Sequence, residues 1–195
     1  MVSLPKIGVL AIQGDYQEHK NMLEGVGAVT KEIRLPNELE DIDGLIIPGG
    51  ESTTIIQLID IYEMRNPIIE RVNSGMAIWG TCAGMISIAK TLKDKRPDPL
   101  HLMDIEVSRN AFGRQIDSFE TYLDIKNIEG PPVRGIFIRA PVVTNIGKGV
   151  EILSEIESGK PVMVLQDKML ATSFHPELTD DIRIHEFFKN LSSAK

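Results

Sequence analysis

Short apolar runs alternate with amphipathic stretches through the first half of the chain. Continuous apolar runs at residues 7–12 and 45–47 predict buried parallel strands, since a strand covered on both faces has no polar positions. Further strands are predicted near residues 29–34 and at 76–79. Helical spacing occupies the stretches between and after them, at residues 16–24, 53–61, 67–72 and 83–90. This alternation predicts an α/β fold, an open, mostly parallel sheet flanked by helices.

After the loop KDKRPDPLH the pattern changes to short strand-like runs separated by Gly, Pro and Asn. We expect strands at residues 105–109, 119–125, 136–139, 150–156, 162–166 and 170–174. Such runs predict an antiparallel or mixed section added to the parallel sheet. A final helix is expected at residues 179–191.

Composition and charge limit the class of protein. With 195 residues and 42% apolar content, we expect one domain spanning residues 1–195 around one core. A net charge of −7 and the lack of a Lys/Arg cluster argue against nucleic acid as a partner. No apolar run approaches the roughly 20 residues of a membrane span. A single cysteine and a first strand without a leader before it predict a cytoplasmic protein with no disulfide and no CxxC metal site.

The single cysteine, Cys82, lies in the segment GTCAG, at the predicted corner between a strand and a helix. Gly80 and Gly84 flank it at two positions on either side, and such glycines permit the tight turn and close backbone contacts of a nucleophile elbow. A thiol at a helix N-terminus is also favoured as the reactive thiolate. The alternative is a small buried core residue, so the elbow needs a base, an orienting acid and an oxyanion hole elsewhere.

A base and its orienting acid are predicted in the segment SFHPEL. His175 follows a predicted strand, and Pro176 favours an extended backbone at the residue before it. In an extended backbone Glu177 projects to the same side as His175, so its carboxylate can accept from one ring nitrogen and leave the other for a thiol. We expect the remaining histidines to be ordinary surface or core-edge residues: His19, His101 and His185.

Backbone donors for an oxyanion are predicted in the segment PGGEST and after the cysteine. Gly49 and Gly50 offer N–H groups before a helix that we expect Ser52 or Thr53 to cap, and the N–H of Ala83 is the second expected donor. A phosphate-binding loop is an alternative, but the segment lacks the Gly-Lys-Ser/Thr of a Walker sequence. A plain turn is the simplest alternative.

The combination of GTCAG, the upstream PGGES and the downstream SFHPEL resembles the triad class of glutamine amidotransferases. AIQGDYQEH, LIIPGGESTT, LMDIEVSRNAFGRQIDSFE and FIRAP extend the resemblance over nearly the whole chain, to the family of glutaminase subunits of pyridoxal 5′-phosphate synthase. The cysteine and HPE elements are shared by the wider class, whereas PGGESTT and RNAFGRQ are more specific to this family. His101 departs from the family, in which glycine is expected at that position.

The resemblance implies a class I glutamine amidotransferase-like fold in which Cys82, His175 and Glu177 hydrolyse L-glutamine to glutamate and ammonia. It implies a (β/α)₈ synthase subunit as the partner in a hetero-oligomer and recipient of the ammonia, and the chemistry requires no metal or organic cofactor. The residues that the resemblance places around glutamine are Gly50, Glu51, Ser52, Arg109, Ile138 and Arg139. An arginine and Glu51 suit the α-carboxylate and α-ammonium of that substrate.

Regulation by the synthase partner is a further expectation. A glutaminase subunit that releases ammonia without a recipient wastes it, so low activity in the free subunit is an advantage. The Gly49–Gly50 peptide lacks Cβ atoms on both sides, so it can rotate between presenting a carbonyl and presenting an N–H to the oxyanion. We expect docking of the synthase to select the N–H orientation.

Three other functions remain open on the sequence alone. A cysteine peptidase or chaperone-like protein on a similar scaffold shares the elbow, but the HPE and PGGES segments argue against it. A glutaminase of another amidotransferase, in histidine or nucleotide biosynthesis, is separated only by the family-specific segments. A binding module without catalysis is disfavoured by the intact Cys-His-Glu set.

Overall fold

The computed structural model describes residues 4–109 and 118–193 of the chain. Within them, five neighbouring strands run parallel in the order β12 (Met169–Thr172), β4 (Ala77–Thr81), β3 (Gly44–Ile47), β1 (Lys6–Leu10) and β2 (Val29–Ile33). Two antiparallel strands, β11 (Pro161–Gln166) and β10 (Glu151–Glu155), extend this sheet beyond β12. The predicted mostly parallel, mixed sheet is confirmed.

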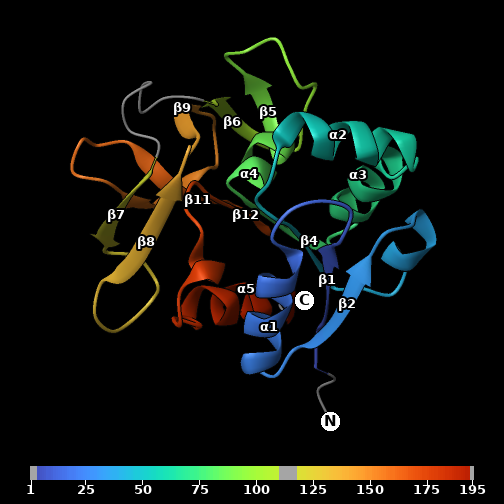
Figure 1. Ribbon diagram of the computed structural model, residues 1–195, viewed down its shortest axis with the longest axis horizontal. Helices are drawn as coiled ribbons and strands as arrows, with labels where there is room; N and C mark the ends of the chain where they lie inside the picture. Colours follow the sequence, from blue (N-terminus) through green and yellow to red (C-terminus); the bar gives the residue numbers. More distant parts are fainter. Residues whose placement is uncertain (1–3, 110–117, 194–195) are drawn as a thin grey trace.

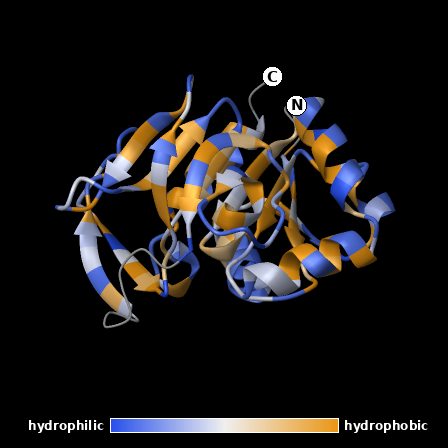
Figure 2. Ribbon diagram, turned by 90° about the horizontal axis from the view of Figure 1, so that it is seen from above, coloured by the Kyte–Doolittle hydropathy of each residue, from blue (hydrophilic) through white to orange (hydrophobic). Residues whose placement is uncertain are grey.

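Helices cover both faces of the sheet (Figure 1). Helices α1 (Tyr16–Gly25) and α5 (Arg183–Ser193) pack on one face, and α2 (Ser52–Ile61), α3 (Arg65–Asn73) and α4 (Ala83–Ile88) pack on the other. Successive strand residues contribute to opposite faces, because side chains alternate along a strand. Ile78, for example, packs with α2 and α4, whereas Trp79 packs with α5. In Figure 2 the central strands are mostly hydrophobic, while the outer helices alternate hydrophobic and hydrophilic residues.

Two smaller sheets form the section between α4 and β10 in the described residues. One contains β5 (Ala89–Leu92), β6 (Met103–Ser108) and β9 (Val142–Ile146), and the other pairs β7 (Ser118–Leu123) with β8 (Val133–Ile138). The prediction missed β5 and β9. Residues 89–90, expected at the end of a helix, belong to β5, because Ala89 turns to an extended conformation and the segment pairs with β6. Residues 110–115 of the RNAFGRQ motif lie outside the described residues.

The last helix begins later than predicted. Helix α5 starts at Arg183 rather than near residue 179, because the segment before it forms the 3₁₀ turn η2 (Pro176–Leu178) with Thr179 as its C-cap. The carboxylate of Asp181 accepts a hydrogen bond from the backbone N–H of Arg183, where the helix begins. Within residues 4–109 and 118–193, no helix combines the length and apolar character needed to cross a membrane.

Candidate active site

Cys82 occupies a strained corner between β4 and α4. It is the N-cap of α4 with φ 49° and ψ −103°, a left-handed conformation that L residues rarely adopt. A Cβ on Gly84 would collide with the carbonyl oxygen of Ile47, and one on Gly80 with the backbone of Gly84. The close backbone approach expected of the two glycines is therefore present, and it forces the chain to turn at the thiol.

His175 and Glu177 are joined by a hydrogen bond of 2.6 Å between His175 Nδ1 and Glu177 Oε1. The predicted pairing is present, but the predicted extended backbone is wrong. Pro176–Leu178 forms the 3₁₀ turn η2, which brings the Glu177 carboxylate back against the ring. The backbone N–H of His175 donates to the carbonyl of Ile136 on β8 at 2.8 Å, which fixes where the turn starts.

The electrostatics of the pair favour a charged imidazole. Burial lowers the pKa of His175, but hydrogen bonds with Cys82 and Glu177 outweigh burial and raise this pKa to about 10. Burial raises the pKa of the Glu177 carboxyl, which is buried with its ring partner. The Nδ1–H directed at Glu177 leaves Nε2 for exchange with the thiol. The arrangement is suited to activating a thiol and moving a proton.

A cavity of about 360 Å³ opens beside Cys82 and His175. All six residues that the resemblance places around glutamine line it, and so does Ala83, an expected oxyanion donor. Its lining consists of Asp15, Gly50, Glu51, Ser52, Cys82, Ala83, Ile86, Arg109, Ile138, Arg139 and His175. Gly49 is not part of this lining but packs on the His175 ring, since a Cβ there would lie 2.5 Å from Cε1.

The sequence analysis missed Asp15, whose carboxylate Oδ2 lies 3.9 Å from His175 Nδ1. A signal was available, because Asp15 follows the carboxyl end of β1, the sheet edge where parallel strands place their ligand sites. Asp15, His175 and Glu177 also bring potential metal-ligating atoms within 4.8 Å of one another. His175 Nδ1, one of these atoms, is already engaged in the hydrogen bond with Glu177.

Two hydrogen bonds hold the PGGES loop. The Gly49 carbonyl accepts from the Asp15 backbone N–H at 3.2 Å, and the Glu51 N–H donates to Gln13 Oε1 at 2.9 Å. The expected capping of α2 by Ser52 or Thr53 is wrong. Glu51 is the N-cap, and its carboxylate accepts from the N–H groups of Thr53 at 3.1 Å and Thr54 at 2.7 Å.

Opposite charges face each other across the cavity wall. Arg109 Nη2 lies 3.4 Å from Glu51 Oε1, and Arg109 Nη1 donates to the carbonyl of Arg96. Partial burial raises the pKa of Glu51, but the N–H groups at the start of α2 outweigh it and the pKa is lowered overall. Glu51 therefore presents a carboxylate and Arg109 a guanidinium, which together complement an α-amino acid.

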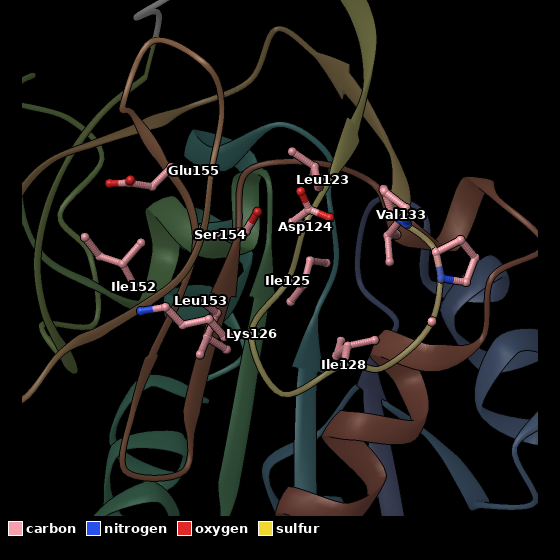
Figure 3. Close-up of a pocket in the computed structure, with 13 residues that line it drawn as sticks. Leu123, Asp124, Ile125, Lys126, Ile128, Val133, Ile152, Leu153, Ser154 and Glu155 are labelled. Carbon is pink, nitrogen blue, oxygen red and sulfur yellow. The ribbon is translucent and has the colours of Figure 1, made fainter.

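A larger cavity, of about 600 Å³, lies away from the thiol (Figure 3). It is bounded by the connection between β7 and β8 and by β10, and neither a cysteine nor a histidine lines it. Ser154 on β10 is buried there, and its hydroxyl has no hydrogen-bond partner among the described residues. Cavity size therefore does not single out the cavity that Cys82 and His175 line.

The predicted surface or core-edge positions of His19 and His185 are wrong, because both side chains are completely buried. The spacing gave a signal, since His19 and Leu23 are one helical turn apart and both face the core. His101 is exposed, as expected, and has φ 56°. This left-handed conformation is the one that glycine adopts most easily, which agrees with the glycine expected there.

Comparisons with known proteins extend over almost the whole chain. The SNO glutamine amidotransferase family matches residues 9–192. The chain is 50% identical to pyridoxal 5′-phosphate synthase subunit PdxT of Salinispora tropica over 99% of each chain. It is 52% identical to the protein of the same name from Dehalococcoides mccartyi, over 97% of this chain and 98% of the relative. A crystal structure described as a glutamine amidotransferase superposes with a TM-score of 0.90 at 45% identity, covering 96% of this chain and 99% of that one.

Proposed function

The chain belongs to the SNO glutamine amidotransferase family, and we propose that it is the glutaminase subunit of a pyridoxal 5′-phosphate synthase. One observation carries the assignment of the site. The thiol on a strained elbow shares one cavity with a histidine that a buried carboxylate orients, and the charges of that cavity complement an α-amino acid. Full-length relatives at about half identity support this function over a peptidase or a glutaminase of another pathway.

The reaction follows from the positions of three side chains. Cys82, as thiolate, attacks the side-chain amide carbon of glutamine, and a sulfur–carbon bond forms. His175, as imidazolium, gives its proton to the leaving nitrogen, so the carbon–nitrogen bond breaks and ammonia departs. Water, deprotonated by His175, then attacks the thioester and releases glutamate and the thiolate. Glu177 keeps Nδ1 protonated and the ring oriented throughout.

Binding of glutamine is assigned to the cavity wall. The guanidinium of Arg109 or Arg139 takes the α-carboxylate, and Glu51 takes the α-ammonium. Ile138 and Ser52 flank the remainder of the substrate. In the complex with the synthase, the N–H groups of Gly50 and Ala83 face the developing oxyanion, and one such contact is worth roughly 10²-fold to 10³-fold in turnover. The chemistry calls for no metal or organic cofactor.

The proposal includes a (β/α)₈ synthase subunit as the cytoplasmic partner that receives ammonia. In the free chain the Asp15 N–H restrains the carbonyl of the Gly49–Gly50 peptide, and the next peptide is restrained by the bond from the Glu51 N–H to Gln13. We propose that docking of the synthase releases this restraint and turns an N–H toward the oxyanion. Partner binding then raises turnover by a factor of up to roughly 10³.

Glutamate release and pyridoxal 5′-phosphate formation test the function together. Cys82→Ala is expected to abolish glutamine hydrolysis, while the synthase still forms product from added ammonia. The variant folds, because loss of one sulfur leaves little cavity. Glutamine hydrolysis by purified Cys82→Ala would refute the nucleophile, and equal turnover with and without saturating synthase would refute the gating.

A further inference from the structure

Two buried histidines lie behind the proposed triad, on the side away from the cavity. His19 on α1 and His185 on α5 are far apart in sequence, but the two helices pack side by side on one face of the sheet (Figure 1). Both side chains are completely buried. Glutamine hydrolysis as described above uses neither ring, and burying two imidazoles is unfavourable unless their hydrogen bonds are made.

The two rings form a chain of contacts that ends at the proposed orienting acid. His185 Nε2 lies 2.9 Å from His19 Nδ1. On its other side, His19 Nε2 lies 3.0 Å from Thr81 Oγ1 and 3.4 Å from Glu177 Oε2. Glu177 Oε1 is occupied by His175, whereas Oε2 is buried without a hydrogen bond of its own among the described residues. His19 thus faces the unsatisfied oxygen of the carboxylate.

Both histidines are neutral, so each ring has one N–H. Burial lowers the pKa of His19 well below its usual range, and burial lowers that of His185 to about 3. His185 Nδ1 has no hydrogen-bond partner among the described residues. A buried N–H without an acceptor costs more than a bare ring nitrogen in an apolar site, so the proton of His185 lies on Nε2 and is donated to His19 Nδ1. His19 then has its proton on Nε2, which donates to Thr81 Oγ1 and lies 3.4 Å from Glu177 Oε2.

The opposite tautomer is disfavoured on two counts. A proton on His19 Nδ1 would leave His185 with an unpaired buried N–H. It would also turn the lone pair of His19 Nε2 toward a carboxylate oxygen 3.4 Å away. The hydrogen-bond chain therefore has one direction, from His185 through His19 to Thr81, and its last N–H lies beside Glu177 Oε2.

We propose that His19 is a positioning residue: its Nε2–H, 3.4 Å from the second carboxylate oxygen of Glu177, stabilises the negative charge on that oxygen, with the His19 tautomer fixed by His185. This inference rests on the proposed function, in which Glu177 orients His175. With Oε1 hydrogen-bonded to His175 and Oε2 facing the His19 N–H dipole, Glu177 keeps its orientation relative to the ring and remains ionised although it is buried. Loss of His19 then lowers turnover without affecting glutamine binding, since His19 does not line the cavity.

The test compares two amides at one position, in the complex with the synthase subunit. In His19→Gln the amide nitrogen reaches the place of Nε2 and can donate to Glu177. In His19→Asn the shorter side chain reaches only the place of Nδ1. We expect His19→Asn to lower kcat for glutamate release by roughly 10-fold to 100-fold, with KM changed less than about 2-fold. His19→Gln is expected to retain kcat within about 3-fold.

The pH profile supplies a readout that a merely structural role would not move. The ionisable groups facing Glu177 are His175 next to it, His19 from α1 and Asp15 from the loop before α1. Those facing His19 are His185, His175 and Glu177. Without the His19 donor, protonation of Glu177 becomes easier, so the acid limb of kcat/KM moves to higher pH in His19→Asn and stays in place in His19→Gln.

Leu23→Ala is the matched control, because Leu23 is buried one turn later on α1 and its side chain offers no hydrogen-bond donor. It is expected to destabilise the fold and leave the acid limb unmoved. Equal kcat and equal acid limbs in the two amide variants would overturn the proposal. Should neither amide variant fold, His185→Phe removes only the donor that fixes the His19 tautomer, and an unchanged pH profile there would overturn it.

The parallel measurement of Cys82→Ala separates the two levels of inference. Activity in Cys82→Ala means that the proposed triad is wrong. An inactive Cys82→Ala, together with indistinguishable amide variants, removes the role of His19 alone.

Discussion

The two sides of His175 differ in nearly every physical respect. On the cavity side, Asp15, Glu51 and Arg109 are partly exposed, and their charges are open to substrate and solvent. On the inner side, His19, His185 and Thr81 are completely buried, and uncharged groups contact one another at 2.9 and 3.0 Å. Glu177 lies at the boundary, with one oxygen on His175 and the other facing His19.

This difference shows how a reactive ring is held in place beside an open cavity. Exposed ion pairs such as Arg109 with Glu51 contribute roughly 0–1 kcal/mol, so they cannot by themselves fix a neighbouring side chain. Buried hydrogen bonds between groups without rotational freedom can do so. In the proposed function the cavity side therefore supplies substrate contacts, and the inner side supplies orientation.

The largest effect is expected at the boundary itself. His175→Ala should lower glutaminase turnover by roughly 10⁴-fold or more, because it removes the group that transfers the protons. Glu177→Gln should leave turnover about 10-fold to 100-fold above that of His175→Ala, because the amide retains part of the orientation. Single-turnover glutamate release, with circular dichroism as the control for folding, measures both. Equal losses in folded variants would contradict the separation of proton transfer from orientation.

Gly49→Ala tests whether the inner side is rigid. The new Cβ would lie 2.5 Å from His175 Cε1, and a ring held from behind by Glu177 cannot retreat. We expect turnover to fall by roughly 10²-fold while the fold is retained, since a misplaced catalytic group is costly. Gly25→Ala is the control, because its Cβ meets only Ile182 at 3.9 Å. Wild-type turnover in Gly49→Ala would show that the His175 ring can move away from the new methyl group and that the inner side does not hold it rigidly.

On the cavity side, Arg109→Ala is expected to act on binding. KM for glutamine should rise by roughly 10-fold with a much smaller change in kcat, because a charged contact to the substrate is lost in ground state and transition state alike. Stability should change by less than about 1 kcal/mol, since the pair with Glu51 is exposed. Steady-state kinetics and urea unfolding check the two parts. A large fall in kcat with unchanged KM would place Arg109 among the groups that act in the transition state.

The smallest effect expected is an opposite pH dependence of stability on the two sides. Folding lowers the pKa of His185 from 6.5 to about 3. The stabilisation of the fold by this neutral histidine is therefore present above pH 6.5 and is lost as the pH falls toward 3. Folding raises the pKa of His175 to about 10. The stabilisation of the fold by this charged histidine is therefore present below pH 6.5 and is lost as the pH rises toward 10. Each histidine changes the free energy of unfolding by at most about 1.4 kcal/mol per pH unit.

Urea unfolding of His185→Phe between pH 4.5 and 9 measures this contrast. At acid pH, the slope of the unfolding free energy against pH should decrease by the equivalent of about one proton taken up on unfolding. At alkaline pH, this slope should stay as in the parent chain. An unchanged acid slope would show that the buried histidine is not kept neutral by folding.

Much of the fold could be predicted because its signals are local. The apolar runs of the parallel strands and the helical spacing between them depend on neighbouring residues, and they located β1 to β4 and α1 to α3 closely. Strands β5 and β9 were missed because short segments become strands only when a partner such as β6 is in place. The start of α5 was misplaced for a related reason, because the turn η2 holds the HPEL segment against β8.

By itself, the sequence determined which groups are available for the proposed chemistry: a thiol between glycines at a strand end, a histidine followed two residues later by a carboxylate, and an acidic chain without a cluster of Lys and Arg. These features can be recognised in the sequence because each depends on residues a few positions apart. Only the tertiary structure decided that Asp15 approaches His175, that the smaller cavity contains the thiol, and that His19 and His185 meet in the interior. The two histidines are 166 positions apart, so only the packing of α1 against α5 on the same face of the sheet brings them together.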